Sequence, residues 1–83
     1  HRVEKTRYQL SLTGGDWVVD QFAGRNAPLL LAEVELPSAQ VPVEIPPWCG
    51  PEITGDGRWS NAALAQRPLQ EWPEKERQAF GYA

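Results

Sequence analysis

The stretch Leu29-Leu30-Leu31-Ala32-Glu33-Val34-Glu35-Leu36 predicts the most strongly patterned strand of this 83-residue chain. Side chains alternate between the two faces of a strand, so Glu33 and Glu35 share one face and lie about 6.6 Å apart. The opposite face is wholly apolar and consists of Leu30, Ala32, Val34 and Leu36. Because a sheet buries its apolar face, we expect that face to pack against helices or another layer. The two carboxylates would then occupy the other face.

Two further strands are predicted upstream, over residues 2–12 and 17–22. The residues between them, Thr13-Gly14-Gly15-Asp16, have turn chemistry and predict a hairpin with a four-residue loop. Three strands at this meander spacing indicate an antiparallel sheet. Lys5 and Arg7 share a face of the first strand, and Asp20 lies on the second.

Downstream of residue 36 the sequence changes character. Four prolines between Pro37 and Pro47 exclude a long helix, although a short helical turn around residues 38–41 is compatible with them. Residues 48–57 read as a loop or an irregular strand. The chain is therefore predicted to be α+β, mainly antiparallel β, with its helices confined to the last third.

Two short helices are predicted there. Ser60 can cap a helix over residues 61–66, which ends before Pro68. Pro73 opens a second helix that runs to about Phe80, with two glutamates in its first turn.

The face shared by Glu33 and Glu35 suggests a chemistry. Two neighbouring carboxylates repel one another and gain from a shared cation, and Mg²⁺ takes one or two carboxylates together with substrate phosphates. Lys5 and Arg7 suit the phosphates themselves, as a point charge and a forked donor array. The plain alternative is a solvated face with salt bridges across the strands. Spacing alone leaves both readings open.

Composition narrows the class of protein. The net charge of −3 argues against a nucleic-acid partner or an anionic membrane surface, and the apolar run 27–32 is too short to span a membrane. The lone Cys49 cannot form a disulfide within the chain, which favours a reducing compartment such as the cytoplasm. The chain starts at His1 and contains no methionine, so we expect it to be an excerpt from a longer protein.

Several segments, in this order, resemble the second half of the CYTH domain, the family of triphosphate tunnel metalloenzymes. The resemblance covers about residues 2 to 68. It is carried by Arg2-Val3-Glu4-Lys5-Thr6-Arg7-Tyr8, Trp17-Val18-Val19-Asp20-Gln21-Phe22-Ala23-Gly24, Leu29-Leu30-Leu31-Ala32-Glu33-Val34-Glu35, Pro47-Trp48-Cys49-Gly50-Pro51-Glu52-Ile53-Thr54, Arg58-Trp59-Ser60-Asn61 and Ala63-Leu64-Ala65.

This resemblance implies a fold and a set of site residues. Residues 1–68 would form half of an eight-stranded tunnel barrel with charges inside and short helices outside, and residues 69–83 a helical tail of unknown role. Substrate phosphates would be bound by Lys5 and Arg7, with Arg58 contributing from the closing loop. The metal, Mg²⁺ or Mn²⁺, would be held by Asp20, Glu33 and Glu35.

The implied activity is metal-dependent hydrolysis of inorganic triphosphate or a related organic triphosphate. The family also includes thiamine triphosphatases and class IV adenylate cyclases. The Glu-x-Glu-x-Lys strand that opens the family's domain is not in this sequence, so we expect the chain alone to be inactive. It would need the missing N-terminal half or self-association. The alternatives are a non-catalytic module that binds phosphate or polyphosphate, a class IV adenylate cyclase-like enzyme, and a structural sheet whose charges are merely solvated.

Overall fold

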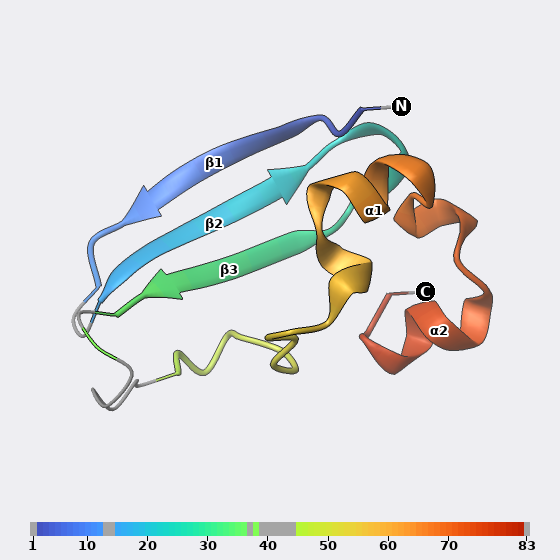
Figure 1. Ribbon diagram of the computed structural model, residues 1–83. Coiled ribbons are helices and arrows are strands. Elements are labelled where there is room, and N and C mark those ends of the chain that lie inside the picture. The colour runs from blue at the N-terminus through green and yellow to red at the C-terminus, as the bar shows by residue number, and fades with distance from the viewer. Residues whose placement is uncertain (1, 13–14, 37, 39–44, 83) are drawn as a thin grey trace.

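The computed structural model describes residues 2–12, 15–36, 38 and 45–82. It is a small α+β domain built from a three-stranded antiparallel sheet and two short helices (Figure 1). The elements in chain order are β1 (Lys5–Leu10), β2 (Asp16–Phe22), η1 (Gly24–Asn26), β3 (Leu30–Glu35), η2 (Gly57–Trp59), α1 (Asn61–Gln66), η3 (Leu69–Glu71) and α2 (Glu74–Ala79), where η marks a 3-10 helix.

The sheet has the order β1-β2-β3, and its register fixes which residues share a face. Arg7 lies opposite Asp20, and Val18 lies opposite Glu33. Directly paired residues point to the same side of an antiparallel sheet. One face therefore carries all five charged strand residues singled out above: Lys5, Arg7, Asp20, Glu33 and Glu35. We call it the charged face.

The predicted helices are confirmed. Helix α1 occupies residues 61–66, and the Ser60 hydroxyl accepts a hydrogen bond of 3.1 Å from the N–H of Ala63. Helix α2 follows Pro73, with both predicted glutamates in its first turn. Residues 13 and 14 of the predicted hairpin loop lie outside the described part of the chain. So does all but the first residue of the helical turn predicted around residues 38–41.

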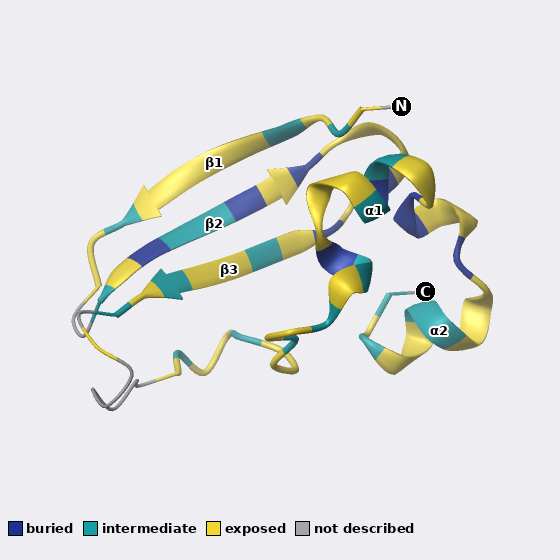
Figure 2. Ribbon diagram, in the orientation of Figure 1, coloured by how far each residue is buried: buried dark blue, intermediate teal, exposed yellow. Residues whose placement is uncertain are grey.

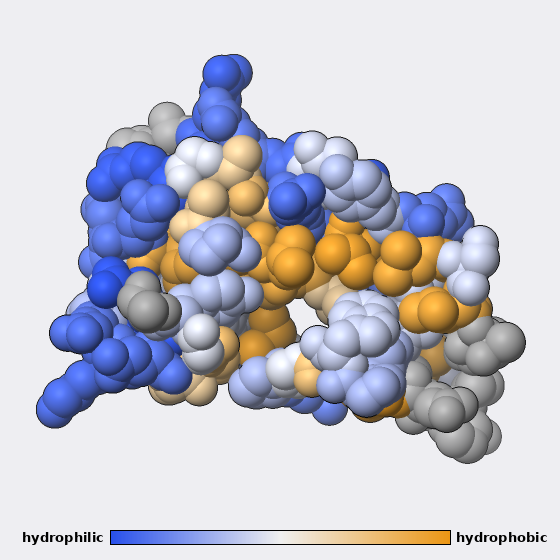
Figure 3. Space-filling view, turned by 180° about the vertical axis from the view of Figure 1, so that it is seen from behind, coloured by the Kyte–Doolittle hydropathy of each residue, from blue (hydrophilic) through white to orange (hydrophobic). Residues whose placement is uncertain are grey.

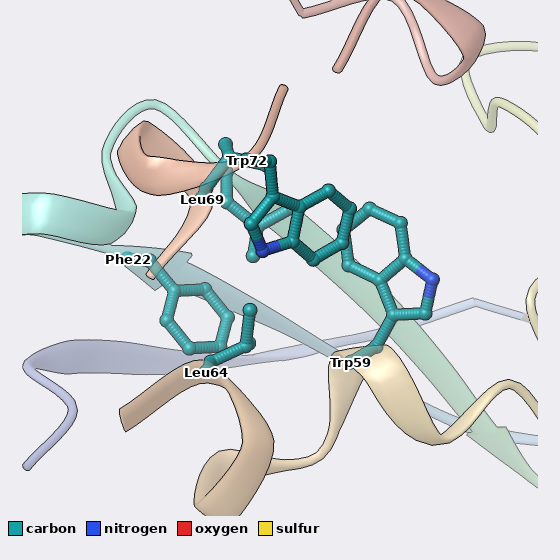
Figure 4. Close-up of a cluster of buried hydrophobic side chains, with 6 residues drawn as sticks. Phe22, Trp59, Leu64, Leu69 and Trp72 are labelled. Atoms are coloured by element: carbon teal, nitrogen blue, oxygen red, sulfur yellow. The ribbon is translucent and has the colours of Figure 1, made fainter. Parts of the chain in front are cut away.

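A cluster of buried apolar side chains joins the sheet to the C-terminal helices (Figure 4). The rings of Trp59 and Trp72 lie 4.9 Å apart and are tilted by 58°. Leu64 is fully buried. The cluster consists of Phe22, Leu29, Trp59, Leu64, Leu69 and Trp72. Three large aromatic rings and three leucines thus join the sheet to the C-terminal segments.

The helices pack against the charged face, not against the apolar one. Phe22 is two residues beyond Asp20 on β2, so both side chains point to the same side. Phe22 belongs to the core, and Leu31, opposite Asp20, packs against it. On the other side, Leu30 is 55% exposed. We expected the Leu30 face to pack against helices or another layer. The described helices do not cover it, because Phe22 and Leu31 make one end of the charged face apolar enough to bury. That another layer covers the Leu30 face stays a prediction.

The opposite face of the sheet is apolar and is covered at one end only. Figure 3 shows hydrophobic side chains gathered over the strands on the side hidden in Figure 1. Trp17, 3% exposed, contacts the ring of Trp48 at 6.5 Å between centroids, so the loop around Trp48 covers that end. Tyr8 and Leu30 remain about half exposed. Figure 2 shows buried residues along β2 and around η2, α1 and η3, whereas α2 has none.

The strands form an open sheet within the described residues, with β1 and β3 at its edges. The start of the β3 edge is covered, because the Tyr82 hydroxyl accepts a hydrogen bond of 3.3 Å from the N–H of Leu30. Half of a tunnel barrel is not seen in this sheet and stays a prediction. Among the described helices, neither α1 nor α2 has the length and hydropathy of a membrane-spanning segment. Localisation likewise stays a prediction.

Candidate functional site

Asp20 is the centre of the charged face. Its side chain is 3% exposed, and it receives hydrogen bonds from both cations of β1. Arg7 donates from Nε to Oδ1 at 2.8 Å and from Nη2 to Oδ2 at 2.9 Å. Lys5 donates from Nζ to Oδ2 at 2.8 Å. The forked Arg7 contact is the bidentate geometry that matches a carboxylate, and it fixes the orientation of the guanidinium.

These contacts keep Asp20 ionised despite its burial. The hydrogen bonds from Arg7, and then those from Lys5, lower the pKa of Asp20 to about 2, although burial acts in the opposite direction. The hydrogen bonds with Asp20 in turn raise the pKa of Arg7, and the more distant charge of Glu33 adds a small attraction. The three residues form one charged cluster with a net charge of +1.

Lys5 is held by a second contact that the sequence did not predict. Its Nζ donates to Oδ1 of Asn61 at 3.3 Å, and it lies 5.6 Å from the centre of the Phe22 ring. Asn61 is the first residue of α1, so the helix start is attached to the cation of β1. Lys5 and Asn61 are 56 residues apart, and no local pattern could have paired them.

The rest of the charged face is an open hollow of about 520 Å³. Arg7 lies on one side of the hollow, with Glu33 and Glu35 on the other, both exposed. Its full lining is Arg7, Gln9, Asp16, Val18, Glu33, Val34 and Glu35. A hollow with a cation at one side and two carboxylates at the other can accept a polyanion together with a divalent cation.

Asp20, Glu33 and Glu35 do not come together as one ligand set. Within the described ranges, no group of three or more acidic, histidine or cysteine side chains is close enough to hold one metal ion. Asp20 directs both oxygens to Lys5 and Arg7. Glu33 and Glu35 remain as an exposed pair. Such a pair fits Mg²⁺, which commonly binds one or two carboxylates and takes its other oxygens from phosphates and water.

Arg58 lies in the helical layer and is engaged there. It donates to Asp56 from Nε at 2.9 Å and to Glu76 from Nη1 at 3.1 Å. Its guanidinium also lies 4.9 Å from the centre of the Phe80 ring and 5.8 Å from that of Trp72. The hydrogen bonds with Asp56, and then that with Glu76, raise the pKa of Arg58 above its ordinary value. The structure therefore brings Lys5 and Arg7 together and gives Arg58 contacts that join the loop to α2.

Two curated proteins are similar to this chain, and both are named inorganic triphosphatase. One, from Acetivibrio thermocellus, is 40% identical over 72 residues, which is 87% of this chain and 46% of that protein. The other, from Nitrosomonas europaea, is 48% identical over 67 residues, which is 77% of this chain and 44% of that protein. The chain thus spans a little under half the length of the curated relatives it matches.

No family profile and no solved structure matches the chain. The two relatives support the resemblance to the triphosphatase family drawn from the motifs above, at the level of the family.

Proposed function

We propose that this chain forms part of a metal-dependent hydrolase of inorganic triphosphate. The observation that carries the proposal is the juxtaposition around the hollow of the charged face. Arg7 lies at one side of it, and Glu33 and Glu35 lie at the other. The proposal is further supported by the similarity to two proteins named inorganic triphosphatase.

Lys5 and Arg7 would bind the phosphate oxygens. Lys5 has three donors, of which Asp20 and Asn61 take two, and Arg7 has five, of which Asp20 takes two. The side chains are 23% and 52% exposed, so the remaining donors are accessible to a ligand. Fixed cations of this kind stabilise the charge that builds up on a phosphoryl group during transfer.

Glu33 and Glu35 would hold Mg²⁺ or Mn²⁺. When bound, such an ion neutralises phosphate charge and lowers the pKa of a coordinated water. The protein's own contribution is to place two carboxylates on one strand, exposed and turned toward the hollow that Arg7 also lines. In the helical layer, Arg58 already binds Asp56 and Glu76, so we assign it to stability rather than to phosphate binding.

Turnover requires more than the described strands. The charged face offers two cations and a carboxylate pair on an open sheet, whereas a triphosphate has three phosphoryl groups to neutralise. The relatives are about twice as long as the matched segment. We propose that the active unit completes the site either with further sequence or with a second copy of the chain.

The test is phosphate release from tripolyphosphate with Mg²⁺, measured for the 83-residue chain alone and for the chain in its full-length protein. We expect release only from the full-length protein, and loss of that release in EDTA. Release that persists in EDTA, or equal release from p-nitrophenyl phosphate, would contradict a metal-dependent triphosphatase. Light scattering on the short chain reports whether a second copy substitutes for further sequence.

A further inference from the structure

We infer that Asp20 acts as a positioning residue that holds Lys5 and Arg7 for phosphate binding, and that it does not ligate the metal. The inference rests on the proposed triphosphate site. It assigns to a buried acid a role opposite to the one its charge suggests, because a carboxylate beside a phosphate site would ordinarily repel the ligand.

Both oxygens of the Asp20 carboxylate are already occupied by hydrogen bonds. Oδ1 accepts from Nε of Arg7, and Oδ2 accepts from both Nη2 of Arg7 and Nζ of Lys5, all within 2.8–2.9 Å. The side chain is 3% exposed. A metal ion at Asp20 would have to displace these cations and reach a group that solvent itself barely reaches. Glu33 and Glu35 are exposed, so a metal ion could reach them without displacing the cations that Asp20 binds.

Asp20 fixes the conformation of both cations before a ligand binds. Long side chains such as Lys and Arg lose much conformational freedom when a ligand fixes them, and this cost weakens binding. Arg7 stands directly opposite Asp20 in the sheet, and the forked contact fixes the plane of its guanidinium. Lys5 is fixed by Asp20 on one side and by Asn61 on the other. Folding has therefore already restricted both side chains, so they lose less conformational freedom when a ligand binds.

The N–H donors of Lys5 and Arg7 that Asp20 does not bind lie on the exposed side of the charged face. Asp20 lies beneath the two cations, nearly buried, while Lys5 and Arg7 are 23% and 52% exposed. Their unused N–H groups consequently face outward. Among the described residues, Arg7 is also the one cation that lines the hollow next to Glu33 and Glu35. Asp20 thus sets the distance between the phosphate donors and the carboxylate pair.

The experiment uses titration calorimetry on the full-length protein, with tripolyphosphate in EDTA and with Mn²⁺ alone in a second series. Asp20→Asn keeps the shape and removes the charge. Glu74→Gln is the control, because Glu74 is an exposed carboxylate on α2 and does not line the hollow. Positioning predicts that Asp20→Asn weakens tripolyphosphate binding about tenfold, the cost of one charge-assisted hydrogen bond, and leaves Mn²⁺ affinity unchanged. Glu74→Gln should bind tripolyphosphate as well as the parent protein does.

The contrary results are distinct. If Asp20→Asn binds tripolyphosphate more tightly than the parent does, Asp20 acts only through its charge. If it instead loses Mn²⁺ affinity, Asp20 is a ligand. Either result overturns the inference. If Asp20→Asn does not fold, Arg7→Lys replaces it, since this variant keeps the charge and loses the fork. Tripolyphosphate binding equal to that of the parent would then overturn the inference.

Failure of the proposed function gives a different pattern. A full-length parent protein that binds no tripolyphosphate contradicts the triphosphate site itself. The role of Asp20 is then decided by the NMR signal of the Arg7 Nε–H. Positioning predicts a sharp signal that exchanges slowly with solvent in the parent and in Glu74→Gln. That signal should be lost in Asp20→Asn, and its survival there would overturn the inference.

Discussion

Arg7 and Asp20 face one another across neighbouring strands, and the guanidinium of Arg7 contacts both oxygens of the Asp20 carboxylate. One pair thus joins the most exposed cation of the charged face to its most buried anion. The forked contact leaves the far edge of the Arg7 guanidinium for a ligand.

Arg7→Ala should weaken the binding of tripolyphosphate more than that of orthophosphate. The longer ligand spreads several charge-assisted bonds along its length, and Arg7 supplies one of them. Calorimetry in EDTA with both ligands measures the two losses separately. Equal losses for the two ligands would mean that Arg7 does not distinguish chain length. Arg2→Ala is the control, because Arg2 is a largely exposed cation outside β1.

A second prediction concerns the metal. Changing Glu33 and Glu35 together to Gln removes two charges from one strand and should abolish Mn²⁺ binding to the chain, as well as metal-dependent turnover of the full-length protein. The amides keep the shape of the carboxylates, so the circular dichroism spectrum should not change. The paired control is Glu52→Gln with Glu74→Gln, two exposed carboxylates elsewhere. Mn²⁺ binding that survives the Glu33 and Glu35 changes would place the metal elsewhere.

A third prediction tests the core. Leu64→Ala removes a fully buried side chain and should destabilise the fold by about 2–5 kcal/mol, enough to unfold many small domains. Leu30→Ala is the same substitution at a site that is 55% exposed, and it should cost far less. Urea denaturation followed by tryptophan fluorescence compares the two. Similar losses would show that the sheet face around Leu30 is buried in solution.

A fourth prediction concerns acid stability. Hydrogen bonds from Arg58, chiefly, hold the pKa of Asp56 at about 2, below its ordinary value of 3.8. A carboxyl whose pKa is lower in the folded state stabilises the fold above the unfolded pKa, and that stabilisation is lost as the pH falls through the folded pKa. Stability should therefore fall between about pH 4 and pH 2.

The control for acid stability is Asp56→Asn, which removes one of the titrating groups. This variant should start less stable at neutral pH and lose less stability on acidification. Glu76, whose pKa is lowered by hydrogen bonds from Arg67 and then Arg58, accounts for a further part of the acid loss. Thermal melts from pH 7 to pH 2 measure both. Parallel curves for the two proteins would show that Asp56 is not linked to folding.

Alternation along the strands predicted that Lys5 and Arg7 share one face of β1 and that Glu33 and Glu35 share one face of β3, and the Ser60 cap and Pro68 predicted the limits of α1. Those features depend on neighbouring residues. The expectation that helices or another layer cover the Leu30 face did not identify where the helices pack, which is against the end of the charged face that carries Phe22 and Leu31. Their joint effect depends on a register between strands. The contact of Lys5 with Asn61 depends on the complete fold.

The N–H of Leu30 donates a hydrogen bond to the Tyr82 hydroxyl, so the β3 edge of the sheet is less available to a further strand than the β1 edge is. Backbone groups of a strand alternate in direction, so Leu30, Ala32 and Val34 turn outward together, and one of the three is already engaged. An incoming strand would have to dislodge Tyr82 or pair over two positions only. On β1, the carbonyl of Glu4 points inward to Ala23, which turns the backbone of Lys5, Arg7 and Gln9 outward. A neighbouring strand should therefore add beside Lys5 and Arg7, and extension of the sheet would enlarge the charged face from that side.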